Sequence, residues 1–182
     1  MPFFSLRFTA AIGVAALFST LLAGCAARNT YVDAVEPDAA KLRFVANTSN
    51  AKLYYLDDQR CEGATGELNT LYVPDTPRRA DMIIAPPAKA RGFLEIKVRP
   101  RIPGYIFLST DGYNWSCGLQ LDLTPQAYAE YEVTLDVRGN RCSAQLSRLM
   151  RVDDQDVRVP MPAIQSGTPA CLRPAPSSSR TQ

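Results

Sequence analysis

The chain has 182 residues, enough for one domain of ordinary size with short attachments. Its 46% hydrophobic and 21% charged residues are proportions typical of a globular protein. Twenty Lys and Arg stand against eighteen Asp and Glu, and a formal charge of +2 argues against a dedicated nucleic-acid binder. There is no histidine, which excludes Ser-His-Asp and Cys-His nucleophiles and catalytic zinc held by histidine.

The first 24 residues have the pattern of an export signal. Arg7 precedes an apolar stretch that covers residues 8–22. This stretch has the length of a signal-peptide core and is short for a membrane-spanning helix, which needs about 20 residues. We therefore exclude residues 1–24 from the folded domain.

The apolar stretch ends in Leu22-Ala23-Gly24-Cys25, which resembles the lipobox of bacterial lipoproteins. In that family the cysteine thiol receives a diacylglyceryl group, the peptidase cuts before it, and the new amine is acylated. The resemblance implies a mature chain that begins at lipidated Cys25, since several acyl chains give stable anchoring. Residue 26 is not aspartate, which by the family's sorting rule implies the outer membrane, with the domain facing the periplasm. The alternative is an ordinary secretory signal.

The mature chain divides into three parts by composition. Residues 25–40 are small and polar without periodicity, which predicts a flexible tether. Residues 41–159 carry the alternating runs of a folded domain. Residues 160–182 are rich in Pro and Ser, which predicts a disordered tail.

Alternation of apolar and polar side chains predicts strands in the middle part. Leu42, Phe44 and Ala46 share one face, with Lys41 and Arg43 on the other. A turn cluster at 47–50 predicts a hairpin to a strand at 52–56. Further runs lie at 94–98, 105–108, 117–123, 131–137 and 142–146, and the run at 105–108 is apolar on both faces, as in a central strand. Seven or eight short strands without a convincing amphipathic helix predict an all-β fold, a small antiparallel β-sandwich.

Four cysteines remain besides Cys25, and an even number in an oxidising compartment predicts two disulfides. Cys117 and Cys142 share the inward phase of their strands, so we favour that pair, with Cys61–Cys171 holding the tail. A direct Cys117–Cys142 bond requires converging strand ends or facing sheets, because a strand between them would separate them by about 9–10 Å. The spacing contains no Cys-x-x-Cys pair, so we expect neither a metal site nor redox catalysis.

Two aromatic residues are candidates for ligand stacking. Tyr113 and Trp115 follow a turn-forming Asp-Gly and would suit a sugar ring if exposed. The alternative is that Trp115 fills the core, because it shares the strand phase of Cys117.

Charged clusters offer weaker candidates. The run 153–156 contains three aspartates but lacks the glycine and distal glutamate of an EF-hand loop, so it predicts a solvated turn. Asp57-Asp58 predicts a hairpin turn. Residues 78–101 contain seven basic and two acidic side chains, which form either a basic face toward anionic lipid or ordinary solvated strand faces.

The function expected from these features is a non-enzymatic lipoprotein that binds or scaffolds another envelope component. The lipobox resemblance covers only the first 26 residues, and the remainder loosely resembles the small cysteine-bearing lipoproteins of proteobacteria. We expect an envelope protein or a cell-wall glycan as partner, with no cofactor and no nucleic acid. The alternative is an envelope enzyme that acts on glycan or peptide through carboxylates, for which a convergent Asp/Glu pair in a concave pocket would be evidence.

Overall fold

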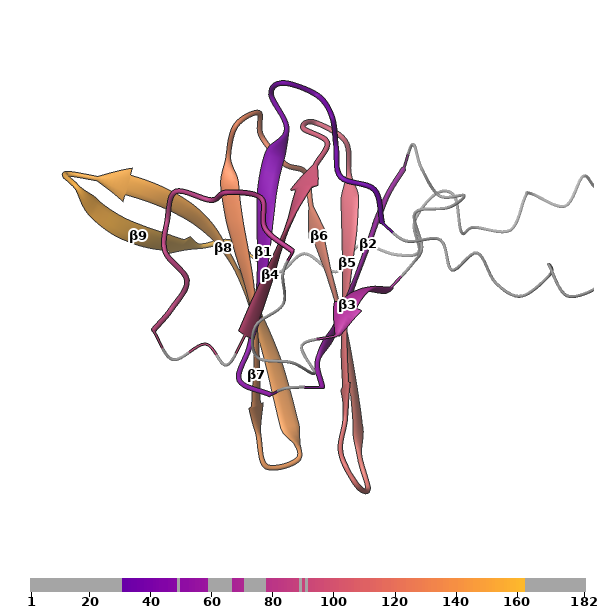
Figure 1. Cartoon of the computed structure of the whole chain (residues 1–182). Coiled ribbons are helices and arrows are strands. Elements are labelled where there is room, and N and C mark those ends of the chain that lie inside the picture. Colours follow the sequence, from indigo (N-terminus) through magenta and orange to yellow (C-terminus); the bar gives the residue numbers. More distant parts are fainter. Residues whose placement is uncertain are drawn as a thin grey trace, which may run out of the picture.

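The computed structural model describes residues 31–48, 50–58, 67–70, 78–88, 90 and 92–162. Within them, nine strands form two sheets that lie face to face (Figure 1). The described residues contain no helix, and hence none long and apolar enough to cross a membrane. The predicted all-β sandwich is confirmed, with slightly more strands than the alternation indicates.

The larger sheet, sheet A, has the strand order β4-β1-β7-β8-β9. Its strands are β1 (Ala40–Ala46), β4 (Gly92–Val98), β7 (Glu130–Arg138), β8 (Arg141–Val152) and β9 (Gln155–Pro160). Its neighbouring strands are antiparallel except β1 and β7, which run parallel. Sheet A is therefore mixed, whereas the sequence pattern predicts only antiparallel neighbours.

The smaller sheet, sheet B, has the strand order β3-β2-β5-β6 and is antiparallel throughout. Its strands are β2 (Lys52–Asp57), β3 (Glu67–Thr70), β5 (Gly104–Asp111) and β6 (Ser116–Leu123). The run apolar on both faces lies in β5, which has neighbours on both sides, as predicted. Inward side chains from both sheets meet in one core, in which Leu42, Phe44, Leu53, Ile106 and Val133 are fully buried.

The turn cluster at 47–50 does not close a hairpin. It connects β1 in sheet A to β2 in sheet B, so the two strands lie in different sheets. Asn47 donates from its side-chain amide to Asp136 at 2.6 Å, and Thr48 donates to Asn50 at 2.7 Å. The prediction of a turn was correct, but a local pattern of turn residues does not specify which sheet the next strand joins.

A disulfide joins Cys117 in β6 to Cys142 in β8, with Cα atoms 6.4 Å apart. β6 belongs to sheet B and β8 to sheet A, so the bond links the facing sheets. This confirms the favoured Cys117–Cys142 pair. Of the two geometries that allow a direct bond, converging strand ends or facing sheets, the structure has the second. The other predicted pair, Cys61–Cys171, lies outside the described residues.

Part of the predicted tether packs on the sandwich. Tyr31 is buried, and its ring meets that of Tyr55 edge-on with centroids 5.5 Å apart. The Tyr31 hydroxyl donates to the carbonyl oxygen of Lys97 at 2.8 Å. Burial raises the pKa of both tyrosine hydroxyls well above the ordinary value, so both are neutral. The folded domain thus begins by residue 31, not at residue 41.

The outer face of sheet A is covered by residues 78–88, which we call the strap (Figure 1). The strap has no regular secondary structure, and charged side chains of the sheet bind its backbone. Glu95 accepts a hydrogen bond from the amide of Ala80 at 3.0 Å, and Arg158 donates to the carbonyl of Ala85 at 2.6 Å. Because the strap belongs to no helix or sheet, its peptide groups need other hydrogen-bond partners, and these side chains provide them.

Arg43 lies beneath the strap with only 1% of its surface exposed. Its guanidinium contacts Glu95 on β4 at 2.8 Å and Glu132 on β7 at 3.2 Å. Arg158 also binds Glu132, at 2.8 Å, which completes a cluster of two arginines and two glutamates. The alternation places Arg43 correctly on the face opposite Leu42 but gives no sign that this face is covered.

Candidate functional site

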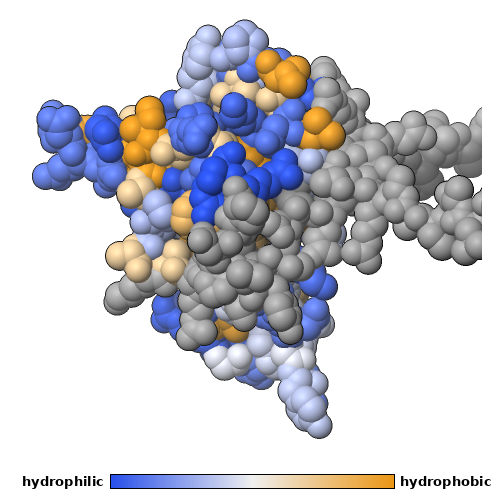
Figure 2. Space-filling model, in the orientation of Figure 1, coloured by the Kyte–Doolittle hydropathy of each residue, from blue (hydrophilic) through white to orange (hydrophobic). Residues whose placement is uncertain are grey.

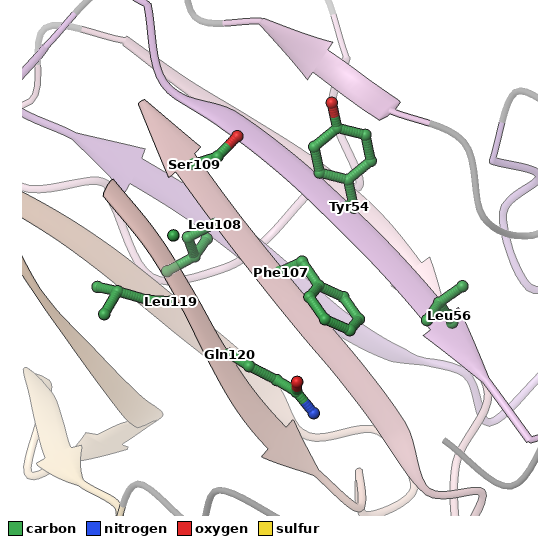
Figure 3. Close-up of a pocket in the computed structure, with 8 residues that line it drawn as sticks. Tyr54, Leu56, Phe107, Leu108, Ser109, Leu119 and Gln120 are labelled. Carbon is green, nitrogen blue, oxygen red and sulfur yellow. The ribbon is translucent and has the colours of Figure 1, made fainter. Parts of the chain in front are cut away.

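The outer face of sheet B carries an apolar hollow of about 550 Å³ over β2, β5 and β6 (Figure 3). Tyr54 and Leu56 approach it from β2, Phe107 from β5 and Gln120 from β6. We call this hollow the groove.

The strand register explains how the groove forms. Tyr54 lies directly opposite Phe107, which lies directly opposite Gln120. Side chains directly opposite on neighbouring antiparallel strands have Cβ atoms about 4.5–5.5 Å apart, so these three form one row across the sheet. Their strand neighbours Leu53 and Leu108 face the core instead.

Gly118 deepens the groove next to that row. It pairs with Ser109 on β5, and a Cβ atom placed on Gly118 would meet no heavy atom within 4 Å. The missing side chain therefore leaves open space on the sheet surface. This space accepts a larger residue without a clash, which makes Gly118 a good position for a test.

The chemistry of the groove suits binding. The described residues that line it contribute two aromatic rings, aliphatic side chains, one hydroxymethyl group and one amide. Among these described lining residues there is no carboxylate, amine or thiol, the groups on which proton transfer at neutral pH usually depends. Apolar walls with a few polar groups are typical of sites that recognise a partner by shape and buried area.

The two aromatic residues proposed for stacking differ in their exposure. Tyr113 is 98% exposed on the turn between β5 and β6, whereas Trp115 is half-buried and packs against the core. The indole of Trp115 lies so close to Gly112 that a Cβ there would overlap it. Trp115 therefore has the packing role given as the alternative, whereas ligand stacking at the exposed Tyr113 stays a prediction.

Two carboxylates line a second, smaller hollow of about 320 Å³, with Lys41, Lys97 and Tyr128 among its other residues. These carboxylates belong to Glu36 and Glu130. Glu130 accepts hydrogen bonds from the amide of Ile83 at 2.9 and 3.1 Å and pairs with Lys41 at 3.3 Å. Glu130 thus holds the strap, which is a structural task.

Much of the basic excess in residues 78–101 is compensated within the fold. Three of these arginines form ion pairs with aspartates: Arg78 with Asp33 at 2.9 Å, Arg99 with Asp57 at 3.1 Å and Arg101 with Asp38 at 2.7 Å. Asp57, predicted in a hairpin turn, ends β2 as a buried residue. Of the run 153–156, Asp153 and Asp154 form the turn between β8 and β9, whereas Gln155 and Asp156 begin β9, so the predicted turn is shorter than the run.

Within the described part of the chain, no group of His, Cys, Asp or Glu side chains is suited to hold a metal ion. Cys25, Cys61 and Cys171 lie outside that part, so lipidation at Cys25 stays a prediction.

Comparison with known proteins gives no match. Neither the protein-family models, nor the curated proteins, nor the solved structures contain a significant relative of this chain. The chain's own geometry therefore carries the functional argument.

The groove was missed at the sequence level, although a signal was present. The strand 52–57 carries Tyr54 and Leu56 on the phase opposite to the buried Leu53 and Tyr55. Apolar residues on both phases are typical of a strand covered on both faces. In this strand, the second apolar face lines the groove.

Proposed function

We propose that the protein is a lipid-anchored outer-membrane lipoprotein that acts as a non-enzymatic binding module in the cell envelope. Its binding surface is the groove, and the occupant is an apolar segment of an envelope protein. The single observation that carries the proposal is the row formed by Tyr54, Phe107 and Gln120 on the outer face of sheet B. The lipobox resemblance at Cys25 supports the location.

The composition of the groove favours a protein partner over a cell-wall glycan. Sugar sites combine aromatic faces with many hydrogen-bonding groups, because each buried hydroxyl needs a partner. The groove offers Ser109, Gln120 and the hydroxyl of Tyr54 against a larger apolar area. Aliphatic and aromatic side chains of a protein match this surface better.

The anchor is tested by Cys25→Ser. We expect this variant to accumulate as unprocessed precursor without lipid, because the hydroxyl of serine does not replace the thiol that receives the diacylglyceryl group. Intact-mass spectrometry and membrane fractionation measure the result. A wild-type mature chain with an unmodified Cys25, or one that begins at another residue, would contradict the anchoring argument.

The groove is tested by filling it. A photo-crosslinking residue at Gln120 in intact cells is expected to capture one reproducible envelope protein. Gly118→Leu should reduce the capture at least about tenfold, since loss of roughly 1.4 kcal/mol of binding free energy has that effect. Its melting temperature should stay within a few degrees of wild type, because open space surrounds the new side chain.

The matched control is Ser143→Leu, which adds the same side chain at an exposed position on sheet A. This control should leave the capture unchanged. If Gly118→Leu folds and captures the partner as well as wild type, the groove is not the binding surface. Capture of glycan fragments alone would mean that the groove binds the cell wall and not a protein.

The second candidate is the envelope enzyme, and its carboxylates would be Glu36 and Glu130. The shared hollow is the observation that favours it. Hydrolysis of cell-wall material by the purified protein that disappears in Glu36→Gln would support the enzyme over the binding module.

A further inference from the structure

The β8–β9 hairpin projects from the sandwich as an arm, residues 148–160 (Figure 1). Sheet A has five strands and sheet B has four, and β9 is the edge strand of the larger sheet. No other strand of the described residues pairs with the outer edge of β9. Figure 2 shows the arm with a hydrophilic tip and hydrophobic surface behind it.

One face of the arm is aliphatic and open to solvent. Met150, Val152 and Val159 are exposed by 40%, 46% and 42%, and the half-exposed Val157 lies directly opposite Met150. Strand alternation places all four on the same face. A two-stranded ribbon with an exposed apolar face is marginally stable by itself, so this arrangement favours a partner.

The β9 strand is complementary to a second copy of itself. In an antiparallel pair centred on Val157, that residue meets its own copy, and Asp156 lies opposite Arg158 of the other chain. The contact between Asp156 and Arg158 therefore occurs twice by symmetry, as expected of an isologous interface. Pro160, which lacks a backbone N–H, falls outside the five paired residues 155–159.

The charged side chains are placed to extend this pairing. Asp156 binds Arg151 at 2.8 Å and Arg158 binds Glu132 at 2.8 Å within one chain. The side chains of Asp156 and Arg158 remain 29% and 32% exposed. Across the pair, positive and negative side chains would alternate. The row runs from Arg151 to Asp156 of one chain and continues with Arg158 and Glu132 of the other chain.

We propose that two copies of this chain associate through β9, forming a symmetric dimer with a sheet continuous across both. The interface combines the main-chain edge of β9, the Asp156–Arg158 contacts and a joint aliphatic face from the two arms. It lies on sheet A and leaves the groove of sheet B open, so it adds to the proposed binding function and does not depend on it.

The test is Val157→Lys, measured on the full-length protein in detergent by sedimentation equilibrium. Wild type is expected to form dimers whose dissociation constant rises at least about tenfold in the variant, because two ammonium groups then lie opposite each other at the symmetry axis. Ser143→Lys is the control, since it places the same charge at an exposed position of β8 that lies outside the arm. It should keep the dimer, and unchanged circular dichroism verifies the fold of both variants.

A second variant keeps the proposal testable where detergent alters association. Val157→Cys should form an interchain disulfide in intact cells, seen as a dimer on a non-reducing gel. Val152→Cys should form much less. A wild-type chain that is monomeric at all concentrations, or a Val157→Cys chain that links only to a different protein, would overturn the proposal.

Discussion

Arg43→Met is expected to lower the free energy of unfolding by about 3–5 kcal/mol, because it leaves Glu95 charged and buried without its cation. Glu95 is 3% exposed and its ion pair with Arg43 measures 2.8 Å. The strap loses a bond too, since Arg43 also donates to the carbonyl of Ile84. Urea denaturation at neutral pH measures the loss.

Two further variants separate the charge effect from a packing effect. Arg138→Met replaces an arginine whose side chain is 85% exposed, so its effect should stay within about 0.5 kcal/mol. The double variant Arg43→Met/Glu95→Gln should recover part of the stability, because it removes the orphaned charge while Glu132 keeps Arg158. If the double variant is no more stable than Arg43→Met, the loss is a matter of volume and the electrostatic account is wrong.

Loss of the Cys117–Cys142 bond is the second large effect we expect. The double variant Cys117→Ala/Cys142→Ala should cost roughly 3–4 kcal/mol on the chain-entropy model, since the two residues are 25 positions apart. Domains of this size typically have only about 5–15 kcal/mol of stability, so the melting temperature should fall markedly. Differential scanning calorimetry under non-reducing conditions measures the change.

The comparison variant for the disulfide is Cys171→Ala. We expect a smaller loss from it, because residues 160–182 have the composition of a disordered tail. A non-reducing peptide map of protein from the periplasm identifies the bonds directly. Free thiols at Cys117 and Cys142 in that map would contradict the bond. If Cys171→Ala lowers the stability as much as the double variant does, the expectation of a smaller loss for Cys171 is wrong.

The elements of the fold were largely predictable from sequence, because strand alternation is a local property. The runs at 117–123, 131–137 and 142–146 lie within β6, β7 and β8 as expected. Pairing was less accessible, since it depends on residues far apart in the chain. The turn at 47–50 looks like a hairpin locally, yet β1 pairs with β7, whose first residue lies 90 positions after that of β1.

The candidate site was harder to predict than the strands. Alternation identified Lys41 and Arg43 as the polar phase of their strand, but the strap that covers Arg43 has no periodic signal. The groove depends on Tyr54, Phe107 and Gln120, which are 53 and 13 residues apart and meet only through strand register. By contrast, Trp115 was a candidate for ligand binding from the sequence, but it packs against the core.

The parallel pairing of β1 with β7 has a consequence for how the chain folds as it emerges from a ribosome or an export channel. Sheet A contains β1 between β4 and β7, so its central pair forms only after residue 138 has appeared. All four strands of sheet B are present fifteen residues earlier, when the chain has reached Leu123. Non-local pairings of this kind make folding slow, in the range of about milliseconds to seconds. During this interval the apolar inner face of sheet B is exposed to solvent, and this is the surface that a chaperone for unfolded strands would bind.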